Sequence, residues 1–167
     1  MRRSRLVSGL VVGGVVCATA LVTSLSAIAA PATTHSGTEG RVLRYDIRFR
    51  PLEENYVDVG SPGPGIGDML VFQDQIIDRH SGRQVGVEAG SCTITAVLEA
   101  GFQTHCVGTV SLPAGQIAFQ GLASNAPEKR MAIVGGTGRY RTAAGELTVL
   151  ELGENEAGTL TIRLADR

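Results

Sequence analysis

The 167-residue chain contains no tryptophan and one lysine, Lys129, and only 4% of its residues are aromatic. Its arginines are spread along the sequence, so there is no basic stripe that would indicate a nucleic-acid partner. The three histidines are scattered and no C-x2-C pair occurs, which leaves no zinc-site spacing. We therefore expect no nucleic acid and no metal among the ligands of this protein.

The first 29 residues, by contrast, have the pattern of a secretory signal peptide. Three arginines lie at the start, residues 6–28 are almost wholly small or apolar and carry no charge, and Ala27-Ile28-Ala29 fits the small-x-small rule for signal peptidase. The alternative is a retained transmembrane anchor, because this apolar stretch is long enough to span a bilayer. We favour cleavage after Ala29 and a secreted, extracellular protein that has no membrane contact afterwards.

Cleavage there would leave 138 residues, enough for one domain with one core. It would remove three arginines and no acid, so that 12 Lys and Arg stand against 16 Asp and Glu. Residues 30–40 contain mainly Thr, Ser, Gly and Pro and are expected to form a flexible lead-in. Residues 41–167 are then expected to form a single domain.

Apolar residues in this domain recur at every second position, which is the period of a β-strand. In VLRYDIRFR, for example, Leu43, Tyr45, Ile47 and Phe49 alternate with charged residues. No segment has a convincing helical period, so the pattern predicts an all-β fold. Eight strands are expected, over residues 42–50, 67–78, 83–98, 102–112, 115–122, 129–136, 145–152 and 158–165.

Two cysteines, Cys92 and Cys106, remain once the signal segment is removed. An even number of cysteines in an exported chain favours a disulfide. They flank a hairpin whose turn is expected near residues 99–101, so they would lie nearly opposite each other on paired strands. The alternative is a free thiol at Cys92.

The same features separate two all-β architectures. An immunoglobulin-like sandwich needs a Cys…Trp…Cys arrangement with a long loop, whereas this chain has no tryptophan and its cysteines are 14 residues apart. The missing tryptophan also argues against a lipocalin. We therefore predict an eight-stranded antiparallel β-barrel, which has no exposed sheet edges and an interior just wide enough for one small ligand.

A glycine-rich stretch, MAIVGGTGRYRTAAGE (131–146), has two interpretations. A phosphate-binding loop would need G-x-x-x-x-G-K-[ST] leading into a helix, but no lysine follows and the sequence returns to strand alternation. We interpret the stretch as a sharp turn in which Gly135, Gly136 and Gly138 supply positive φ angles and close backbone approach.

This turn resembles the signature I-x-G-G-[ST]-G-x-[FY]-x-x-A-x-G of the allene oxide cyclase and dirigent barrel families. Four further stretches are similar to motifs of these families and occur in the same order. They are YDI (45–47), GDMLVFQDQIID (67–78), VGVEAGSC (85–92) and GQIAFQG (115–121). The resemblance runs from about Leu43 to Leu164, which is nearly the whole expected domain.

The resemblance implies a small barrel that works without a metal or cofactor and that forms a homotrimer. The implied function is the cyclisation, isomerisation or stereoselective coupling of a small apolar metabolite, which the lumen holds in one conformation. The alternative is a non-catalytic extracellular binding or structural barrel.

Two acids are implied as catalytic groups. Asp46 corresponds to a lumen acid in both families, although strand alternation alone would place it outside, paired with Arg44 or Arg48. Asp74 corresponds to a cyclase Asn that helps to hold a bound water. It shares parity with Leu70, Phe72 and Ile76, so it belongs to an apolar face; the alternative is a rim position near the strand end.

Further residues are implied as substrate contacts by their positions in the motifs: Tyr45, Ser61, Pro62, Leu70 and Phe72. For Phe72, packing in the core is an equally good interpretation. The chain also departs from both families. A disulfide would remove the thiol that cyclases place beside the substrate at Cys92, and Arg139 and Ala144 stand where dirigents often have Asp and Arg.

Overall fold

The computed structural model describes residues 40–50, 55–153 and 157–166 of the chain. The signal peptide expected over residues 1–29 and the lead-in up to residue 39 lie outside these ranges. Within them, no helix is both long and apolar enough to cross a membrane.

The described residues form an all-β fold of nine strands, all joined to their neighbours in antiparallel fashion. Eight of them correspond to the eight predicted strands. The strands are β1 (Val42–Arg48), β2 (Tyr56–Val57), β3 (Met69–Ile77), β4 (Gln84–Leu98), β5 (Gly101–Leu112), β6 (Gly115–Ser124), β7 (Glu128–Gly136), β8 (Gly145–Glu151) and β9 (Ala157–Leu164).

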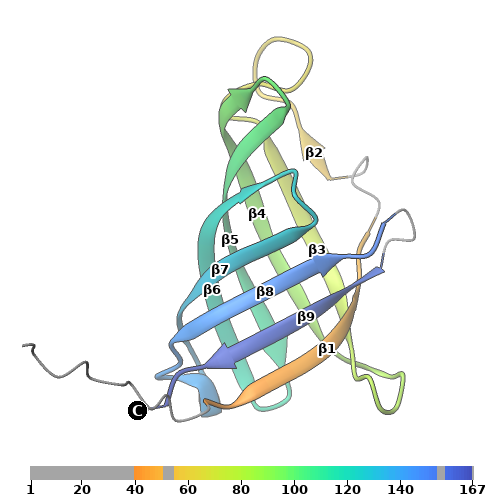
Figure 1. The fold of residues 1–167 in the computed structure, drawn as a ribbon, viewed down its shortest axis with the longest axis vertical. Coiled ribbons are helices and arrows are strands. Elements are labelled where there is room, and N and C mark those ends of the chain that lie inside the picture. The colour runs from red at the N-terminus through yellow and green to blue at the C-terminus, as the bar shows by residue number, and fades with distance from the viewer. Residues whose placement is uncertain (1–39, 51–54, 154–156, 167) are drawn as a thin grey trace, which may run out of the picture. The chain divides into compact units, whose positions relative to one another are not determined.

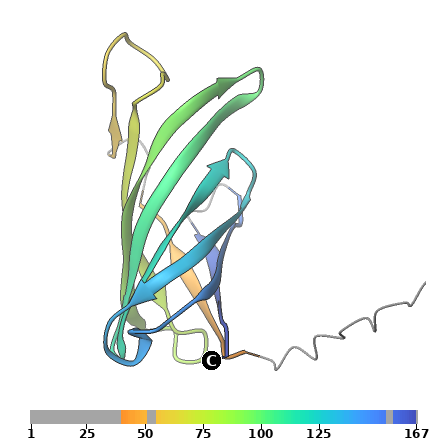
Figure 2. The same ribbon diagram turned by 90° about the vertical axis from the view of Figure 1, so that its left-hand side faces the viewer.

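Eight strands close into a barrel, as predicted, and β2 is an extra strand. Sequential hairpins link β3 to β9, and β1 closes the ring because it pairs with β9 along its whole length and with the C-terminal end of β3. The N-terminal end of β3 pairs instead with β2. Figure 1 shows β8, β9 and β1 across the front, and Figure 2 shows that the long β4–β5 hairpin extends beyond the β6–β7 hairpin.

The interior of the barrel contains a core of its own side chains. The strand alternation puts one face of each strand inside, where aliphatic residues interlock with Phe119 and Tyr140. The most deeply buried aliphatic residues of this core are Ile47, Ile76, Val110, Ile117, Leu147, Leu160 and Ile162. This core closes the end of the barrel that lies opposite the β4–β5 turn.

The glycine-rich stretch forms a corner between β7 and β8, as the interpretation of a turn required. It contains a short 3-10 helix, η2 (Gly138–Tyr140), whose Tyr140 side chain is buried. Gly138 has φ +57°, and a Cβ atom at Gly136 would lie 2.2 Å from the Gln116 carbonyl oxygen. Both positions therefore need glycine, one for its backbone angle and one for close approach.

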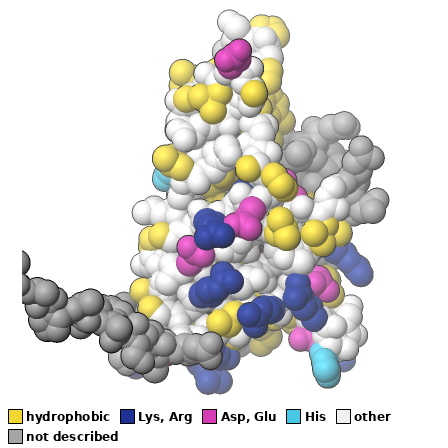
Figure 3. All heavy atoms as spheres, in the orientation of Figure 1, with side chains coloured by type: hydrophobic (Ala, Val, Ile, Leu, Met, Phe, Trp, Pro, Cys, Tyr) yellow, Lys and Arg dark blue, Asp and Glu magenta, His cyan; other side chains and the backbone are white. Residues whose placement is uncertain are grey.

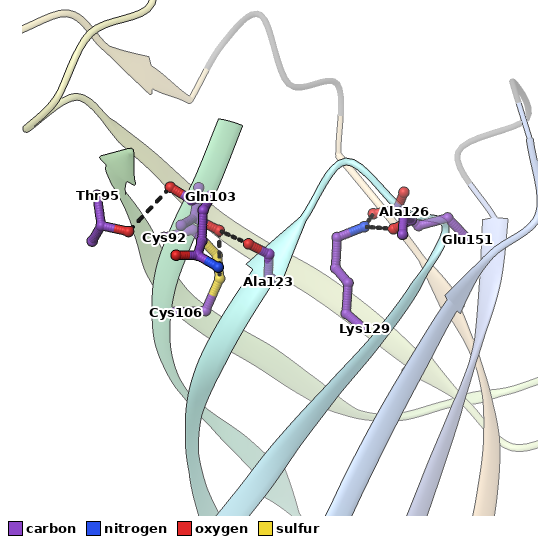
Figure 4. Close-up of a disulfide and its surroundings, with 9 residues drawn as sticks. Cys92, Thr95, Gln103, Cys106, Ala123, Ala126, Lys129 and Glu151 are labelled. Carbon is purple, nitrogen blue, oxygen red and sulfur yellow. Dashed lines mark hydrogen bonds and ion pairs between the residues drawn. A yellow bond between two sulfur atoms is a disulfide. The ribbon is translucent and has the colours of Figure 1, made fainter. Parts of the chain in front are cut away.

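The predicted disulfide joins Cys92 of β4 to Cys106 of β5. The two residues are direct cross-strand partners, with Cα atoms 4.0 Å apart, and the hairpin turn is residues 99–100. Figure 4 shows the bond between the two strands. Cys106 is fully buried. The alternative of a free thiol at Cys92 does not apply to this structure.

The buried carboxylate of Asp68 fixes the loop between β2 and β3. Its Oδ2 atom accepts hydrogen bonds from the Tyr56 hydroxyl (2.5 Å) and the Gly65 N–H (2.7 Å), and its Oδ1 atom accepts one from the Val59 N–H (2.8 Å). The bond from Tyr56 is the main reason that the pKa of Asp68 is lowered. The same bond raises the pKa of Tyr56 to about 12.

Candidate functional site

A cavity of about 120 Å³ lies next to the core, whose residues Met131 and Val149 form part of its wall. Its lining comes from β3, β4, β7 and β8 and from Phe49, which follows β1. The apolar part of the wall includes two of the four phenylalanines in the chain. The lining residues are Phe49, Leu70, Phe72, Asp74, Glu88, Cys92, Lys129, Met131, Val149 and Glu151.

Two glycines, Gly90 and Gly158, leave the space that the Phe72 and Phe49 rings occupy. Gly90 lies directly opposite Phe72 on the neighbouring strand, and a Cβ atom there would come within 2.8 Å of the Phe72 ring. A Cβ atom at Gly158 would likewise meet the Phe49 ring at 2.7 Å. The rings therefore pack against bare backbone and form part of an apolar wall for a ligand.

Two carboxyl groups lie side by side in this cavity. Asp74 and Glu88 are cross-strand partners on β3 and β4, and both side chains face inward. Glu88 is 2% exposed and Asp74 6% exposed. Cβ atoms of such a pair are typically about 5 Å apart. Ionisation of both carboxyl groups is therefore unfavourable, because the two negative charges would repel each other.

Glu88 is the more perturbed of the two acids. Burial, followed by the negative charge of Asp74, raises the pKa of its carboxyl from 4.5 to about 8. Its Oε2 atom has no hydrogen-bond partner among the described residues. A buried polar atom without a partner is costly, and such atoms in native proteins call for an explanation. A ligand group that enters the cavity would satisfy it.

Asp74 has one partner inside the protein. Its Oδ1 atom accepts a hydrogen bond from the Arg50 N–H at 3.0 Å. Burial raises the pKa of Asp74, while this bond and the charge of Arg50 act in the opposite direction. The pair thus holds a proton on Glu88 at neutral pH beside an acceptor at Asp74, an arrangement suited to general acid–base chemistry.

A second polar pair lies where β7 begins and β8 ends. The Lys129 ammonium forms an ion pair with Glu151 and also donates a hydrogen bond to the Ala126 carbonyl oxygen at 3.2 Å. Figure 4 shows the Lys129 side chain reaching both partners. The Lys129 side chain is 20% exposed and that of Glu151 43% exposed, so this pair is nearer to solvent than the two acids.

The structure brings three of the predicted site residues together and leaves four apart. Leu70, Phe72 and Asp74 line the cavity from β3, in agreement with their shared parity. Asp46 does not reach it. Its carboxylate lies on the outer face, 51% exposed, and pairs with Arg79 at 2.8 Å. The alternation of β1 puts Ile47 inside and Asp46 outside, so the expectation of a lumen acid at Asp46 is corrected, although the outer partner is neither Arg44 nor Arg48.

The remaining three predicted contacts lie elsewhere. Tyr45 packs against the buried core, and burial is the main reason that its pKa is raised. Ser61 and Pro62 are exposed in the β2–β3 loop. None of the three lines the cavity. The corresponding expectation of substrate contacts therefore finds no support in the geometry.

Glu88, Lys129 and Glu151 were not anticipated. On β4 the apolar residues Val85 and Val87 suggest an inward row that would leave Glu88 outside. The pairing of β3 with β4 shifts register between Ile76 and Ile77. From that point to the end of β4, the residues that face inward are therefore those that the alternation of Val85 and Val87 would place outside. The available signal was Cys92, because a residue four positions earlier on the same strand shares its face.

The described residues contain no group of three or more side chains that could hold a metal ion. What the geometry does define is a closed antiparallel barrel with one apolar cavity that holds a buried acid pair and an ion pair. This combination of a rigid scaffold, an apolar wall and a few convergent polar groups is typical of a small-molecule site.

Comparison with protein families matches residues 51–164 to the allene oxide cyclase barrel like domain. The chain therefore belongs to this family, in agreement with the resemblance of its motifs. A search of curated proteins finds no match.

Among solved structures, a protein described as pyocyanin demethylase is 32% identical, with a TM-score of 0.66, and the match covers 75% of this chain and 100% of that one. The Diels Alderase AbmU from Streptomyces koyangensis is 17% identical, with a TM-score of 0.62, over 77% of this chain and 70% of that one. The pterocarpan synthase dirigent protein GePTS1 is also 17% identical, with a TM-score of 0.56, over 84% and 96%. The last two likenesses show the fold alone.

Proposed function

We propose that this protein is an enzyme that binds a small, flat, largely apolar metabolite in the barrel lumen and converts it by proton transfer, without a cofactor. Isomerisation, cyclisation and the coupling of an already reactive intermediate are reactions that such proton transfer can assist. Demethylation can be assisted in the same way if water takes up the methyl carbon as formaldehyde and the aromatic ring of the substrate takes up the two electrons. Glu88, which burial and secondarily the negative charge of Asp74 keep protonated, acts as the proton donor.

The observation that carries this proposal is the acid pair. A carboxylic acid buried in an apolar wall, with one oxygen unpartnered, is expensive to maintain and adds nothing to packing. An acid whose pKa lies near neutrality is also the most effective proton donor at neutral pH. Function accounts for both features, whereas a structural barrel would be more stable with an apolar residue at position 88.

The relatives narrow the choice of substrate. Pyocyanin is a planar tricyclic aromatic molecule. The match to the protein described as pyocyanin demethylase covers 100% of that protein's chain. Such a molecule suits walls formed by Phe49 and Phe72, because aromatic rings stack favourably on each other. Pyocyanin is therefore the first substrate to test, followed by other phenazines and by flat polyenes that can cyclise.

The test is to incubate the purified protein with pyocyanin and to follow its visible absorbance together with product mass. Demethylation with water as co-reactant would release the methyl carbon as formaldehyde and leave the ring reduced by two electrons, so it would be indicated by formaldehyde and, after reoxidation by dissolved oxygen, by a product one CH₂ lighter. An isomer of equal mass would indicate rearrangement. We expect Glu88→Gln and Asp74→Asn to reduce turnover by about 10²-fold or more, which is the usual contribution of a positioned acid or base.

Glu146→Gln is the matched control. Glu146 lies on the outer face of β8, half exposed, 3.7 Å from Arg163, so its substitution should leave turnover unchanged. Equal loss of activity in all three variants would contradict the proposal. If pyocyanin, the other phenazines and the flat polyenes bind and are all recovered unchanged, this result would favour the alternative of a non-catalytic binding barrel.

We also propose that the protein is exported. The pattern of residues 1–29 supports this, and so does the disulfide, since such bonds persist mainly in oxidising compartments. N-terminal sequencing of protein from the culture medium should begin at Ala30. An intact Met1 in a membrane fraction would instead support the retained anchor.

We also propose that the protein forms a homo-oligomer, with a trimer as the expected state. The supporting feature is the outer face of strands β3 to β7. Val71, Val107 and Val134 are 41–54% exposed there and line a shallow groove in which no charged residue takes part. The outer face of β8, β9 and β1, seen in Figure 3, carries charges of both signs instead. An uncharged β-branched face of this kind is suited to contact with a second protein surface.

A further inference from the structure

Lys129 occupies an unusual place for the one lysine of the chain. It belongs to the inward-facing row of β7, followed by Met131 and Ile133, both of which are buried. Lysine is rarely kept inside a protein unless it is paired, because removal of its charge from water is costly. Its position at the cavity wall therefore needs an explanation beyond solubility.

Its known partners do not use all of its hydrogen-bonding capacity. An ammonium has three N–H donors. One faces the Ala126 carbonyl oxygen and another faces Glu151. Its third donor has no acceptor among the described residues.

The charged side chains around the cavity would orient a ligand. Lys129 is the one cation in the lining, and three acids accompany it, namely Asp74 on β3, Glu88 on β4 and Glu151 on β8. A negatively charged oxygen on a ligand would be repelled by Asp74 and attracted by Lys129. Glu88, in its neutral form, would meet a proton-accepting atom. These charges favour the orientation in which an anionic ligand oxygen points toward Lys129 and a proton-accepting atom points toward Glu88.

We infer that Lys129 is a specificity-determining residue that binds an ionised oxygen, such as a phenolate or enolate, on an aromatic ligand whose rings lie between Phe49 and Phe72. This inference rests on the proposed function, because it needs an aromatic ligand in the lumen. Glu151 is a positioning residue: its ion pair holds the ammonium in place at the cavity wall.

The test uses two probes that differ at one oxygen, 1-hydroxyphenazine and 1-methoxyphenazine. Only the first can ionise, and its absorption spectrum distinguishes phenol from phenolate. The expected result is that the wild-type protein binds 1-hydroxyphenazine at least about tenfold more tightly and lowers the pKa of the bound hydroxyl, since a nearby cation favours the ionised form. Lys129→Met should remove both effects and change the affinity for 1-methoxyphenazine by less than about twofold.

Two further variants keep the test decisive. Lys129→Arg retains the positive charge and should retain the lowered pKa of the bound hydroxyl, which separates charge from packing. Arg130→Met is the matched control, because Arg130 faces outward, pairs with Glu128 at 2.6 Å and does not line the cavity. It should preserve the preference for 1-hydroxyphenazine.

The outcomes distinguish the inference from the proposed function. Equal binding of the two probes by the wild-type protein, or a preference that survives in Lys129→Met, would overturn the role of Lys129 and leave the aromatic-binding lumen intact. Binding of neither phenazine would overturn the inference and exclude these phenazines as ligands of the lumen, and turnover of flat polyenes would then test the proposed function separately.

Discussion

The replacement of Glu88 by glutamine should make the protein more stable at neutral pH. Glutamine has nearly the same shape as glutamic acid but cannot ionise, so the substitution isolates the cost of keeping an acid in the lumen. In the unfolded chain the Glu88 carboxyl has a pKa near 4.5, and in the folded protein burial and the charge of Asp74 raise that pKa to about 8. Folding at neutral pH therefore requires the uptake of about one proton.

The size of the effect follows from this difference. Each pH unit between the two pKa values costs about 1.4 kcal/mol of folding free energy, so the acid destabilises the fold by about 3 kcal/mol at pH 7. Because the pKa of Glu88 is raised in the folded protein, the stability that the protonated group contributes is fully present below pH 4.5 and is lost as the pH rises toward 8. The advantage of Glu88→Gln should follow the same curve and level off above pH 8.

The assay is urea denaturation of the wild-type protein, Glu88→Gln and the control Glu146→Gln at pH 5, 6, 7 and 8. We expect the free energy of unfolding of Glu88→Gln to exceed that of the wild type increasingly across this range, while Glu146→Gln stays within about 0.5 kcal/mol of the wild type, as exposed pairs contribute little. If Glu88→Gln were less stable by the same amount at every pH, the claim that Glu88 is a buried, protonated acid would be refuted.

Three other predictions follow from the fold and the cavity. Replacement of Cys92 and Cys106 together by alanine should lower the free energy of unfolding by about 3 kcal/mol, because the disulfide closes a loop between residues 14 apart; unchanged stability in chemical denaturation would speak against this. Phe72→Trp should weaken ligand binding in calorimetry without loss of the fold, since the larger ring takes up part of a cavity of about 120 Å³. Val107→Glu should convert a trimer to monomers in native mass spectrometry; a wild-type protein that is already monomeric would contradict the proposed oligomer.

The sequence was sufficient to predict the barrel because strand alternation and turn residues are local signals. All eight predicted strands are present, with ends displaced by no more than a few residues. The exception is β2, which has two residues and exists only because it pairs with the start of β3. A strand so short has no period of its own and depends on tertiary contacts.

The site was less predictable because it depends on register. Asp74 could be placed inside from its neighbours on one strand. Glu88 could not, because a register shift of one residue in β4 exchanges the inner and outer faces. Lys129 and Glu151 meet across β7 and β8 at the rim of the cavity, a contact that neither strand reveals alone. Asp46 shows the opposite error, in which a family motif outweighed a correct local alternation.

The proposed function depends most on a protonated Glu88 that a ligand contacts in the lumen. Carboxyl ¹³C NMR of the glutamate-labelled protein measures this directly, with Glu88→Gln used to assign the resonance. We predict one glutamate that titrates near pH 8, well above its ordinary pKa of 4.5, and whose resonance and pKa both shift when pyocyanin or 1-hydroxyphenazine is bound. A Glu88 carboxyl that titrates near 4.5, or one that a bound ligand leaves unchanged, would contradict the account.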